Sequence, residues 1–244
     1  EIEWAQVIGG TDVDEITSVA ECSDGGYIVG GFFYSSIDLG NGISLTNKGS
    51  NDGMVIKFAK TELPNPTVIQ AKGIGGSNYD FINSVEATSD GGYIVGGYFR
   101  SSSIDLGNGI SLINKGQDDG FLIKYNVGGE VEWTQGIGGT GSDFINSISE
   151  TKDGGYIVGG YFNSRTIEFK NGINLYNNGR YNGIIIKYDE SGEVKWAKAI
   201  VGTDGARIDS VAECSDGGYI VGGSFESRSI DLGNGVSLTN TPIS

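Results

Sequence analysis

The eight residues DGGYIVGG occur four times in the chain, beginning at Asp24, Asp90, Asp153 and Asp216. Their starting points are 66, 63 and 63 residues apart. Self-similarity at one nearly fixed spacing is typical of repeat architectures, in which each unit buries its apolar side chains against its neighbours. The sequence therefore predicts four copies of one supersecondary unit, at approximately residues 11–76, 77–139, 140–202 and 203–244.

Each unit divides into short runs rich in Ile, Val, Tyr and Phe. In the third unit these runs are FINSISET, YIVGGYF, GIIIKYD and VKWAKAI, and turn residues separate them. None has the helical spacing of apolar residues, whereas Asp-Gly-Gly between two β-type runs favours a tight hairpin. Four short antiparallel strands per unit are typical of a β-propeller blade.

The unit is longer than a plain blade, which takes about 40–45 residues. The surplus lies between the second and third runs, where IDLGNGISL alternates around a central Asn-Gly and predicts a small extra hairpin. The predicted fold class is therefore all-β: a β-propeller of four-stranded antiparallel blades, four in this chain, each with an extra hairpin between strands two and three.

The ends of the chain suggest how the last blade is completed. Residues 1–10, EIEWAQVIGG, have the pattern of a fourth strand and are expected to close that blade, so that residues 1–244 form a single domain. The third strand of that blade is missing, unless the final TPIS or sequence beyond residue 244 supplies it. Three arrangements remain open: a four-bladed ring with an imperfect seam, a piece of a larger ring, and two copies that together form eight blades.

The motifs IGGTGSDFINSI, DGGYIVGGYF and DGFLIKYNVGGEVEW resemble those of the bacterial β-propeller repeats called SBBP repeats. The resemblance extends over nearly the whole chain and departs from the pattern at KTELPNPTVIQ in the first unit and in the short last unit. It implies a propeller fold and an extracellular or cell-surface setting in bacteria. Because the family has no single activity, the resemblance supplies no catalytic residues.

Charge and cysteine content exclude several partner classes. The formal net charge is −15, and an acidic surface repels phosphate backbones, so nucleic acid is not an expected partner. No apolar run reaches about 18 residues, so membrane insertion is not expected either.

Cys22 and Cys214 occupy equivalent positions in the first and last units and are expected to be free thiols, unless those two units are neighbours in space.

The sequence offers no convincing catalytic set, and we expect no enzyme activity. Histidine is absent, which removes Ser-His-Asp and Cys-His systems and all His-based metal sites. Asp14, Asp80 and Asp143 recur at one point before strand one, and Ala206 replaces them in the fourth unit. Such a residue is better explained as an acceptor for backbone N–H groups in the turn than as half of a glycosidase carboxylate pair.

Calcium was considered as a cofactor because oxygen-rich glycine loops can bind it. The sequence DLGNG recurs at Asp38, Asp105 and Asp231, and Asp52 and Asp119 follow in NDG and DDG. None has the D-x-D-x-D-G spacing of a calcium-binding loop. We predict turn-forming residues here and no cofactor, with Ca²⁺ as the open alternative.

In a propeller, the connections after strand two share a face with the turns before strand one, and loops on a rigid scaffold commonly bind ligands. Repeated residues should form the scaffold, so the candidates for ligand binding are those that vary between units. They are Tyr34, Arg100, Asn163 and Glu226 after strand two, Tyr79, Phe81, Phe144 and Arg207 near strand one, and Tyr176, Arg180 and Tyr181 in the third unit.

These features predict a non-enzymatic binding or adhesion module that presents its loops to a glycan or protein on a surface. One alternative is a structural or assembly propeller, with a homodimer completing a larger ring. A carbohydrate-active enzyme is the third hypothesis. The string DGGYIVGG is expected to be scaffold: Asp-Gly-Gly forms the turn, Tyr-Ile-Val fills the core, and the closing Gly-Gly allows tight packing or a bend. The three tryptophans, Trp4, Trp133 and Trp196, are expected to pack between blades.

Overall fold

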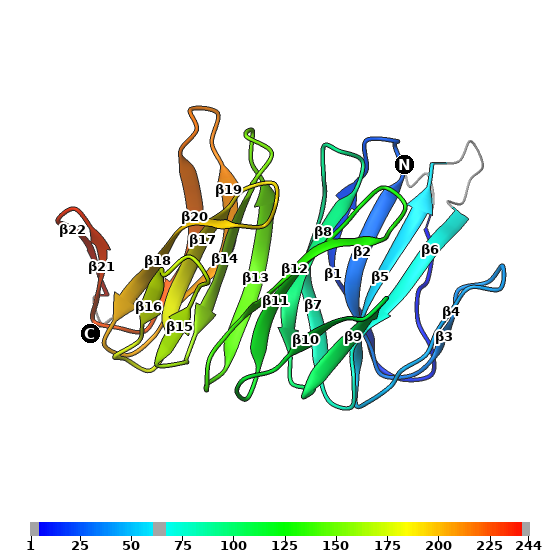
Figure 1. Cartoon of the computed structure of the whole chain (residues 1–244), viewed down its shortest axis with the longest axis horizontal. Helices are drawn as coiled ribbons and strands as arrows, with labels where there is room; N and C mark the ends of the chain where they lie inside the picture. The colour runs from blue at the N-terminus through cyan, green and yellow to red at the C-terminus, as the bar shows by residue number, and fades with distance from the viewer. Residues whose placement is uncertain (1–4, 61–66, 241–244) are drawn as a thin grey trace. The chain divides into compact units, whose positions relative to one another are not determined.

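The computed structural model describes residues 5–60 and 67–240, which form strands and turns without any helix (Figure 1). Within these residues there is accordingly no helix capable of crossing a membrane. The chain divides into two compact units, one of residues 1–114 with 122–134 and the other of residues 115–121 with 135–244. The all-β prediction is confirmed, whereas a single propeller domain stays a prediction.

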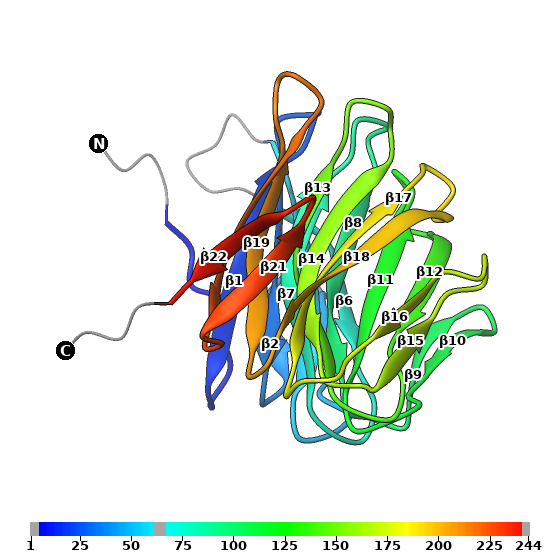
Figure 2. The same ribbon diagram turned by 90° about the vertical axis from the view of Figure 1, so that its left-hand side faces the viewer.

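Three repeats each contribute a four-stranded arrangement in which the strands follow one another in chain order. The first is β1 (Asp14–Glu21), β2 (Tyr27–Phe33), β5 (Asp52–Ala59) and β6 (Thr67–Ile74). The second is β7 (Asp80–Ala87), β8 (Tyr93–Phe99), β11 (Asp119–Tyr125) and β12 (Val131–Ile137). The third is β13 (Asp143–Glu150), β14 (Tyr156–Phe162), β17 (Asn182–Tyr188) and β18 (Val194–Gly202), which lie side by side in Figure 2.

The extra hairpin between strands two and three is confirmed in the first three repeats, and the fourth repeat has the same hairpin after strand two, without a third strand among its described residues. The hairpins are β3 (Ile37–Asp38) with β4 (Ser44–Leu45), β9 (Ser103–Gly107) with β10 (Ile110–Ile113), β15 (Thr166–Glu168) with β16 (Asn174–Tyr176), and β21 (Ser229–Gly233) with β22 (Val236–Thr239). In three of them the turn holds an asparagine at positive φ, at Asn41, Asn108 and Asn234. The aspartate of each DLGNG accepts the N–H of the following glycine, as Asp38 does from Gly40 at 2.9 Å, so its predicted turn-forming role is confirmed.

The fourth repeat contains β19 (Ala206–Glu213) and β20 (Tyr219–Phe225), which form a two-stranded sheet. Its extra hairpin is joined to the third sheet, since β21 pairs with β18 at Val201↔Asp231 and Gly202↔Ile230. The predicted closing strand at residues 1–10 is not among the strands that the structure describes. Residues 5–10 adopt no strand, and residues 1–4 lie outside the described part of the chain.

The Asp-Gly-Gly of the repeated string forms the turn between strands one and two, as predicted. In each copy the aspartate Oδ1 accepts the N–H of the second glycine, at 2.8 Å for Asp24 and Gly26. The first glycine has a φ of 76–84° in the four copies, which a side chain would make unfavourable. The turn therefore depends on both residue types.

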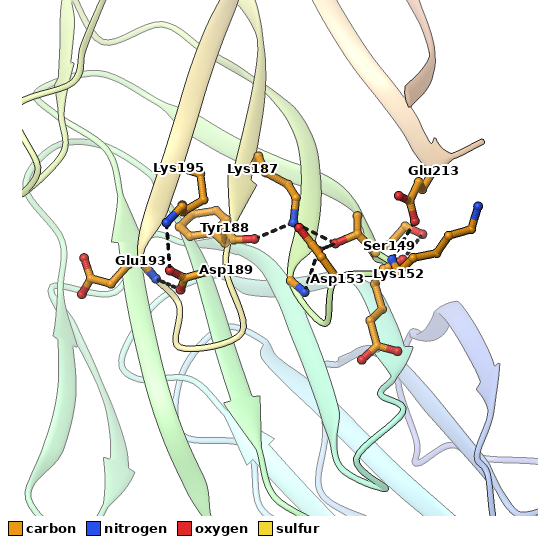
Figure 3. Close-up of polar contacts among 12 residues, drawn as sticks. Ser149, Lys152, Asp153, Lys187, Tyr188, Asp189, Glu193, Lys195 and Glu213 are labelled. Atoms are coloured by element: carbon orange, nitrogen blue, oxygen red, sulfur yellow. Dashed lines mark hydrogen bonds and ion pairs between the residues drawn. The ribbon is translucent and has the colours of Figure 1, made fainter. Parts of the chain in front are cut away.

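A buried lysine of strand three adds a second role to this aspartate. Lys187 is 4% exposed, and its Nζ donates to Asp153 Oδ1 at 2.8 Å, to Thr151 Oγ1 at 2.8 Å and to the carbonyl of Tyr188 at 2.9 Å (Figure 3). The hydrogen bond from Lys187 is the main reason that the pKa of Asp153 lies well below its usual range. The pair thus links the hairpin of strands one and two to strand three.

The closing Gly-Gly allows the next sheet to approach, and this prediction is confirmed within each compact unit. A Cβ on Gly159 of β14 would lie 2.5 Å from Val211 Cγ1 and 2.7 Å from Ile208 Cγ2 of β19. Gly30 of β2 stands in the same relation to Val85 and Ile82 of β7. Strand one of the second repeat and strand one of the fourth repeat therefore each pack apolar side chains onto a glycine of the preceding sheet.

Polar side chains join the same strands across this packing. Ser147 Oγ accepts the N–H of Val211 at 3.2 Å, and Asn146 Nδ2 donates to the carbonyl of Ile208 at 2.8 Å. In the first unit, Ser18 Oγ accepts the N–H of Val85 at 3.1 Å. Backbone groups that face the neighbouring sheet are thereby paired, which is expected wherever they are buried.

The prediction that tryptophan packs between repeats is confirmed at Trp196. Its ring centroid lies 5.7 Å from that of Tyr219 on β20 of the next repeat. Gln70 takes the equivalent place in the first repeat and accepts a hydrogen bond from the hydroxyl of Tyr93 at 3.1 Å. Trp4 lies outside the described residues.

Candidate functional site

The connections after strand two and the turns before strand one lie together at one end of each sheet, which we call the loop edge. In each repeat, the first residue after strand two donates its N–H to the carbonyl of the residue before strand one. These pairs are Tyr34 with Val13, Arg100 with Tyr79, Asn163 with Ser142, and Glu226 with Gly205, at 3.3, 2.9, 2.8 and 2.8 Å. The predicted sharing of one face is therefore confirmed.

A buried aspartate holds the loop edge together. Asp143 is 1% exposed; its Oδ1 accepts the N–H groups of Asn163 and Ser164 at 3.1 and 3.0 Å, and its Oδ2 accepts the Ser164 hydroxyl and the N–H of Gly139. Burial raises the pKa of Asp143, while these donors oppose that rise. Asp80 accepts the equivalent set of four donors in the second repeat. The predicted structural role of these carboxylates is confirmed.

Most candidates of the second compact unit come together in one cluster at the loop edge. The ring of Phe144 stacks on that of Tyr161, with centroids 4.6 Å apart and an interplanar angle of 17°. The ring of Tyr181 meets Tyr161 edge-on at 5.6 Å. We name Phe144, Tyr161, Tyr181, Arg180, Arg207 and Glu226 the aromatic–arginine cluster.

Two arginines and one carboxylate complete the cluster. The guanidinium carbons of Arg207 and Arg180 each lie 5.7 Å from a ring centroid, that of Tyr161 and that of Tyr181. Glu226 accepts the Tyr181 hydroxyl at 2.9 Å and Arg180 Nη1 at 3.2 Å. Burial and the Glu226 carboxylate raise the pKa of Tyr181, so its hydroxyl stays protonated at neutral pH. The arrangement thus combines flat apolar rings with exposed charged groups.

The first compact unit repeats part of this arrangement. Phe81 stacks on Tyr98 at 4.8 Å and meets Phe32 edge-on at 4.8 Å, and Phe32 in turn lies 6.0 Å from Tyr34. Tyr34 and Phe81, two candidates from different repeats, are thereby linked through Phe32. The Arg100 guanidinium lies 5.9 Å from the ring centroid of Tyr79.

The remaining candidates lie near the cluster or apart from it. The Asn163 side-chain amide donates to the carbonyl of Arg180 at 2.5 Å, so Asn163 fixes the backbone beneath the cluster. Tyr176 is 60% exposed on β16, in the extra hairpin, and it is not part of the cluster.

Sequence reasoning missed Phe32, Tyr98 and Tyr161, which occupy the sixth position of strand two. The sequence predicts that the repeated string is scaffold, and the two residues that flank Phe32, Gly31 and Phe33, are indeed buried. The sixth position is only half-buried in the first three repeats and pairs directly with the second residue of strand one, as in Phe144↔Tyr161. The replacement of this aromatic residue by Ser224 in the last repeat was the available signal, because core positions vary less between repeats.

Among the described residues, no group of three His, Cys, Asp or Glu side chains is placed to hold a metal ion. Asp119 is 1% exposed, and its Oδ2 accepts the N–H of Lys115 at 2.9 Å while Oδ1 has no partner. Burial, with a contribution from the Asp143 carboxylate, raises the pKa of Asp119 to about 6. Asn182 holds the equivalent position in the third repeat.

Asp119→Asn is expected to stabilise the protein at neutral pH. A raised pKa means that the folded state binds a proton more tightly than the unfolded chain, whose aspartates titrate near 4. Asp119 therefore contributes its full share to the stability of the folded wild type below about pH 4. This contribution to the free energy of unfolding is lost as the pH rises to about 6. We expect urea unfolding at pH 7.5 to show a gain of about 1–3 kcal/mol in the variant, with a smaller difference at pH 4.5. An equal difference at both pH values would contradict this assignment.

The two cysteines are free thiols, with Cys22 buried and Cys214 half-buried. Burial raises the pKa of the Cys22 thiol, with a smaller lowering by Lys57. A buried thiol with a raised pKa, such as that of Cys22, is a poor nucleophile.

Comparison with known proteins gives a coarse classification. No family model matches the chain. A stretch covering 56% of the chain, 141 residues long, is 26% identical to an uncharacterized WD repeat-containing protein of Acanthamoeba polyphaga mimivirus and covers 10% of that protein. The chain thus spans a small part of this curated relative. A structure of a protein of unknown function from Bacteroides caccae aligns over 92% of this chain and 60% of that chain, with a TM-score of 0.41 and 11% identity.

The internal repeats, the strand order and the WD repeat relative together define a repeat-type all-β protein.

Proposed function

We propose that the chain forms all or part of a β-propeller that serves as a non-enzymatic binding module, with the loop edge facing a glycan or protein ligand. Three features support the propeller. Four strands follow one another in chain order in each of the first three repeats, strand one of the second and of the fourth repeat packs on a glycine of the preceding sheet, and a relative is a WD repeat-containing protein. The observation that carries the binding function is the aromatic–arginine cluster.

The chemistry of the cluster suits recognition rather than catalysis. Tyrosine and arginine dominate binding hot spots because their rings and guanidinium groups offer apolar area together with directional hydrogen bonds. Arg207 is exposed, and the side chains of Arg180 and Glu226 are 69% and 59% exposed, so a ligand reaches them without rearrangement of the scaffold. Asp143 at the loop edge is buried and hydrogen-bonded, and it holds the loop after strand two of the third repeat.

The cellular setting follows from the resemblance to SBBP repeats and is part of the proposal. A secreted or surface-exposed bacterial protein with several similar repeats would present several related loop edges. Weak sites linked in this way gain overall affinity when they engage one surface together. The acidic net charge of −15 favours partners that are neutral or basic.

A ligand screen tests the proposal. The chain is applied to glycan arrays and to extracts of surface proteins, and each retained ligand is then titrated against Arg207→Ala and Arg180→Ala. We expect each substitution to weaken binding about tenfold or more, as at interface hot spots. Tyr176→Ala, at an exposed tyrosine outside the cluster, serves as the matched control and should leave the affinity unchanged.

Two outcomes would contradict the proposal. One is a screen in which no glycan or protein is retained. The other is a ligand whose affinity is insensitive to both arginine substitutions while the variants keep the melting temperature of the wild type.

A further inference from the structure

The extra hairpin of the third repeat has a different turn from the other three. The sequence DLGNG of β3–β4, β9–β10 and β21–β22 becomes EFKNG in β15–β16, so that Lys170 replaces Gly40, Gly107 and Gly233. Those three glycines have φ angles of 79–85°, which a lysine rarely adopts. The turn around Lys170 therefore has a different backbone, in which only Gly172 has a positive φ.

This altered turn frees one side chain and gives another a new partner. In the other three hairpins the aspartate of DLGNG accepts the N–H of the glycine that Lys170 replaces. Glu168 holds the place of that aspartate, and in the described part of the chain its carboxylate accepts no such bond. Asn171 Nδ2 donates to the carbonyl of Val194 at 2.5 Å, which ties the hairpin to the first residue of β18.

A small pocket lies between this hairpin and strands of the second compact unit. It has a volume of about 80 Å³, and its nine lining residues all belong to that unit. They include residues 168–171 of the hairpin, Gln135 of β12 and Glu193 beside β18. No residue of the aromatic–arginine cluster lines it, so the pocket is distinct from the candidate site at the loop edge.

Hydrogen bonds from side-chain amides to backbone carbonyls fix the walls of the pocket. Besides the bond of Asn171, Gln135 Nε2 donates to the carbonyl of Gly192 at 2.8 Å, which joins β12 to the turn before β18. At the next junction Lys198 holds the position of Gln135, and its Nζ donates to the carbonyl of Leu232 in the following hairpin. Because Gln135 binds the turn and not the hairpin, the space between β12 and the hairpin stays open.

Charges of both signs line the pocket. Lys115 and Lys170 contribute ammonium groups, and Glu168 and Glu193 contribute carboxylates. All four residues are exposed, and within the described residues none of these charged groups forms an ion pair or a hydrogen bond. Figure 3 shows the Glu193 carboxylate directed away from Asp189, to which Glu193 donates its backbone N–H. The four groups are therefore available to a ligand that carries both charges.

We propose that this pocket binds a free α-amino acid with a small side chain. The ammonium group of the ligand meets the two glutamates, its carboxylate meets the two lysines, and its side chain contacts the half-buried ring of Phe169. The volume limits the size of the ligand: at about 10–15 Å³ for each water, the space accommodates about five to eight non-hydrogen atoms. Glycine, alanine and serine fall within this range.

The balance of charges in the lining argues against ligands with a single charge. The two ammonium groups and two carboxylates cancel, so that neither a simple anion nor a simple cation gains a net attraction. The end of a polypeptide carries one of the two charges and would satisfy only one pair of side chains. A monosaccharide is neutral but too large for the space.

Titrations of the full chain followed by ¹H–¹⁵N NMR test the proposal. Glycine, L-alanine and L-serine are the ligands, and we expect saturable shifts at the Gln135 side-chain amide and at the backbone amides of Lys170, Asn171 and Val194. Propionate and ethylamine each lack one of the two charges of alanine. Both should bind about tenfold more weakly than alanine, because each forgoes the charge-assisted hydrogen bonds of the missing group.

Three variants test the contribution of single charges. Lys115→Gln and Glu193→Gln should each weaken the binding of alanine about tenfold. Lys170→Gly restores the glycine of the other hairpins and should abolish saturable binding, since it removes an ammonium group and the altered turn together. Lys48→Gln is the matched control: Lys48 holds the position of Lys115 in the first repeat, in the other compact unit, and the affinity should stay unchanged.

Three results would overturn the proposal. The first is the absence of saturable shifts with all three amino acids at millimolar concentration. The second is binding of propionate or ethylamine as tight as that of alanine, which identifies a simple ion as the ligand. The third is an affinity for alanine that Lys115→Gln and Glu193→Gln change no more than Lys48→Gln does, which places the binding outside this pocket.

Discussion

Asp143→Ala is expected to lower the free energy of unfolding by about 3–5 kcal/mol, the largest effect of any single substitution considered for this chain. The carboxylate accepts four donors at the loop edge, from Gly139, Asn163 and Ser164. Removing it leaves these buried donors unpaired in a site where water has little access. Chemical denaturation at pH 7 measures the loss, which should appear in the midpoint with little change in slope.

Asp231→Ala is the matched control for this prediction. Asp231 also accepts an N–H group in a glycine-containing turn, but it is exposed, and within the described residues its side chain accepts that of Gly233 alone. We expect a loss of about 1 kcal/mol or less. A loss at Asp143 as small as that at Asp231 would show that the buried carboxylate does not hold the loop edge together.

The second large effect is expected at Gly159, where an added methyl group has no room. Its Cβ would lie within 2.7 Å of two side-chain carbons of β19, those of Val211 and Ile208, and both belong to the next repeat. Gly159→Ala must therefore push β19 away from β14, and we expect a loss of about 1–3 kcal/mol, typical of overpacked cores. Thermal or urea unfolding measures this loss.

The last repeat provides the control for Gly159 within the same molecule. Gly222 holds the equivalent position in β20, and the nearest atom to its added Cβ is Ser210 Cβ at 4.0 Å. Gly222→Ala should change the stability by no more than about 0.5 kcal/mol. If both substitutions left the stability unchanged, this would contradict the close packing of strand one against the glycine of the preceding sheet.

Local sequence rules predicted most of the scaffold because each repeat contains its own turn motifs and strand patterns. Asp-Gly-Gly and Asn-Gly fix turns through backbone conformation, and both the hairpins and the extra hairpins were found where those motifs occur. The role of Asp80 and Asp143 as acceptors also followed from their position before strand one. Such features depend on neighbours in the chain, which is why one sequence suffices to find them.

Features that depend on contacts between residues far apart in the chain were harder to predict. The lysine of strand three pairs with the turn aspartate of its own repeat across 34 residues, as Lys187 does with Asp153, and nothing in its local sequence marks it as buried. Tyr161 joins the candidate site because strand two exposes its sixth residue beside Arg207 of the following repeat. Residues inside a repeated string can therefore serve both the scaffold and the binding surface.

Hydrogen exchange of the chain with a ligand retained in the screen tests most directly the claim that the loop edge binds. We predict slower exchange at the amides of the loop edge in the second unit, around Ser142, Arg180 and Gly205, and unchanged exchange at the opposite ends of the same strands, around residues 153–155 and 189–192. Protection confined to the Asp-Gly-Gly turns, with the loop edge unaffected, would contradict the account.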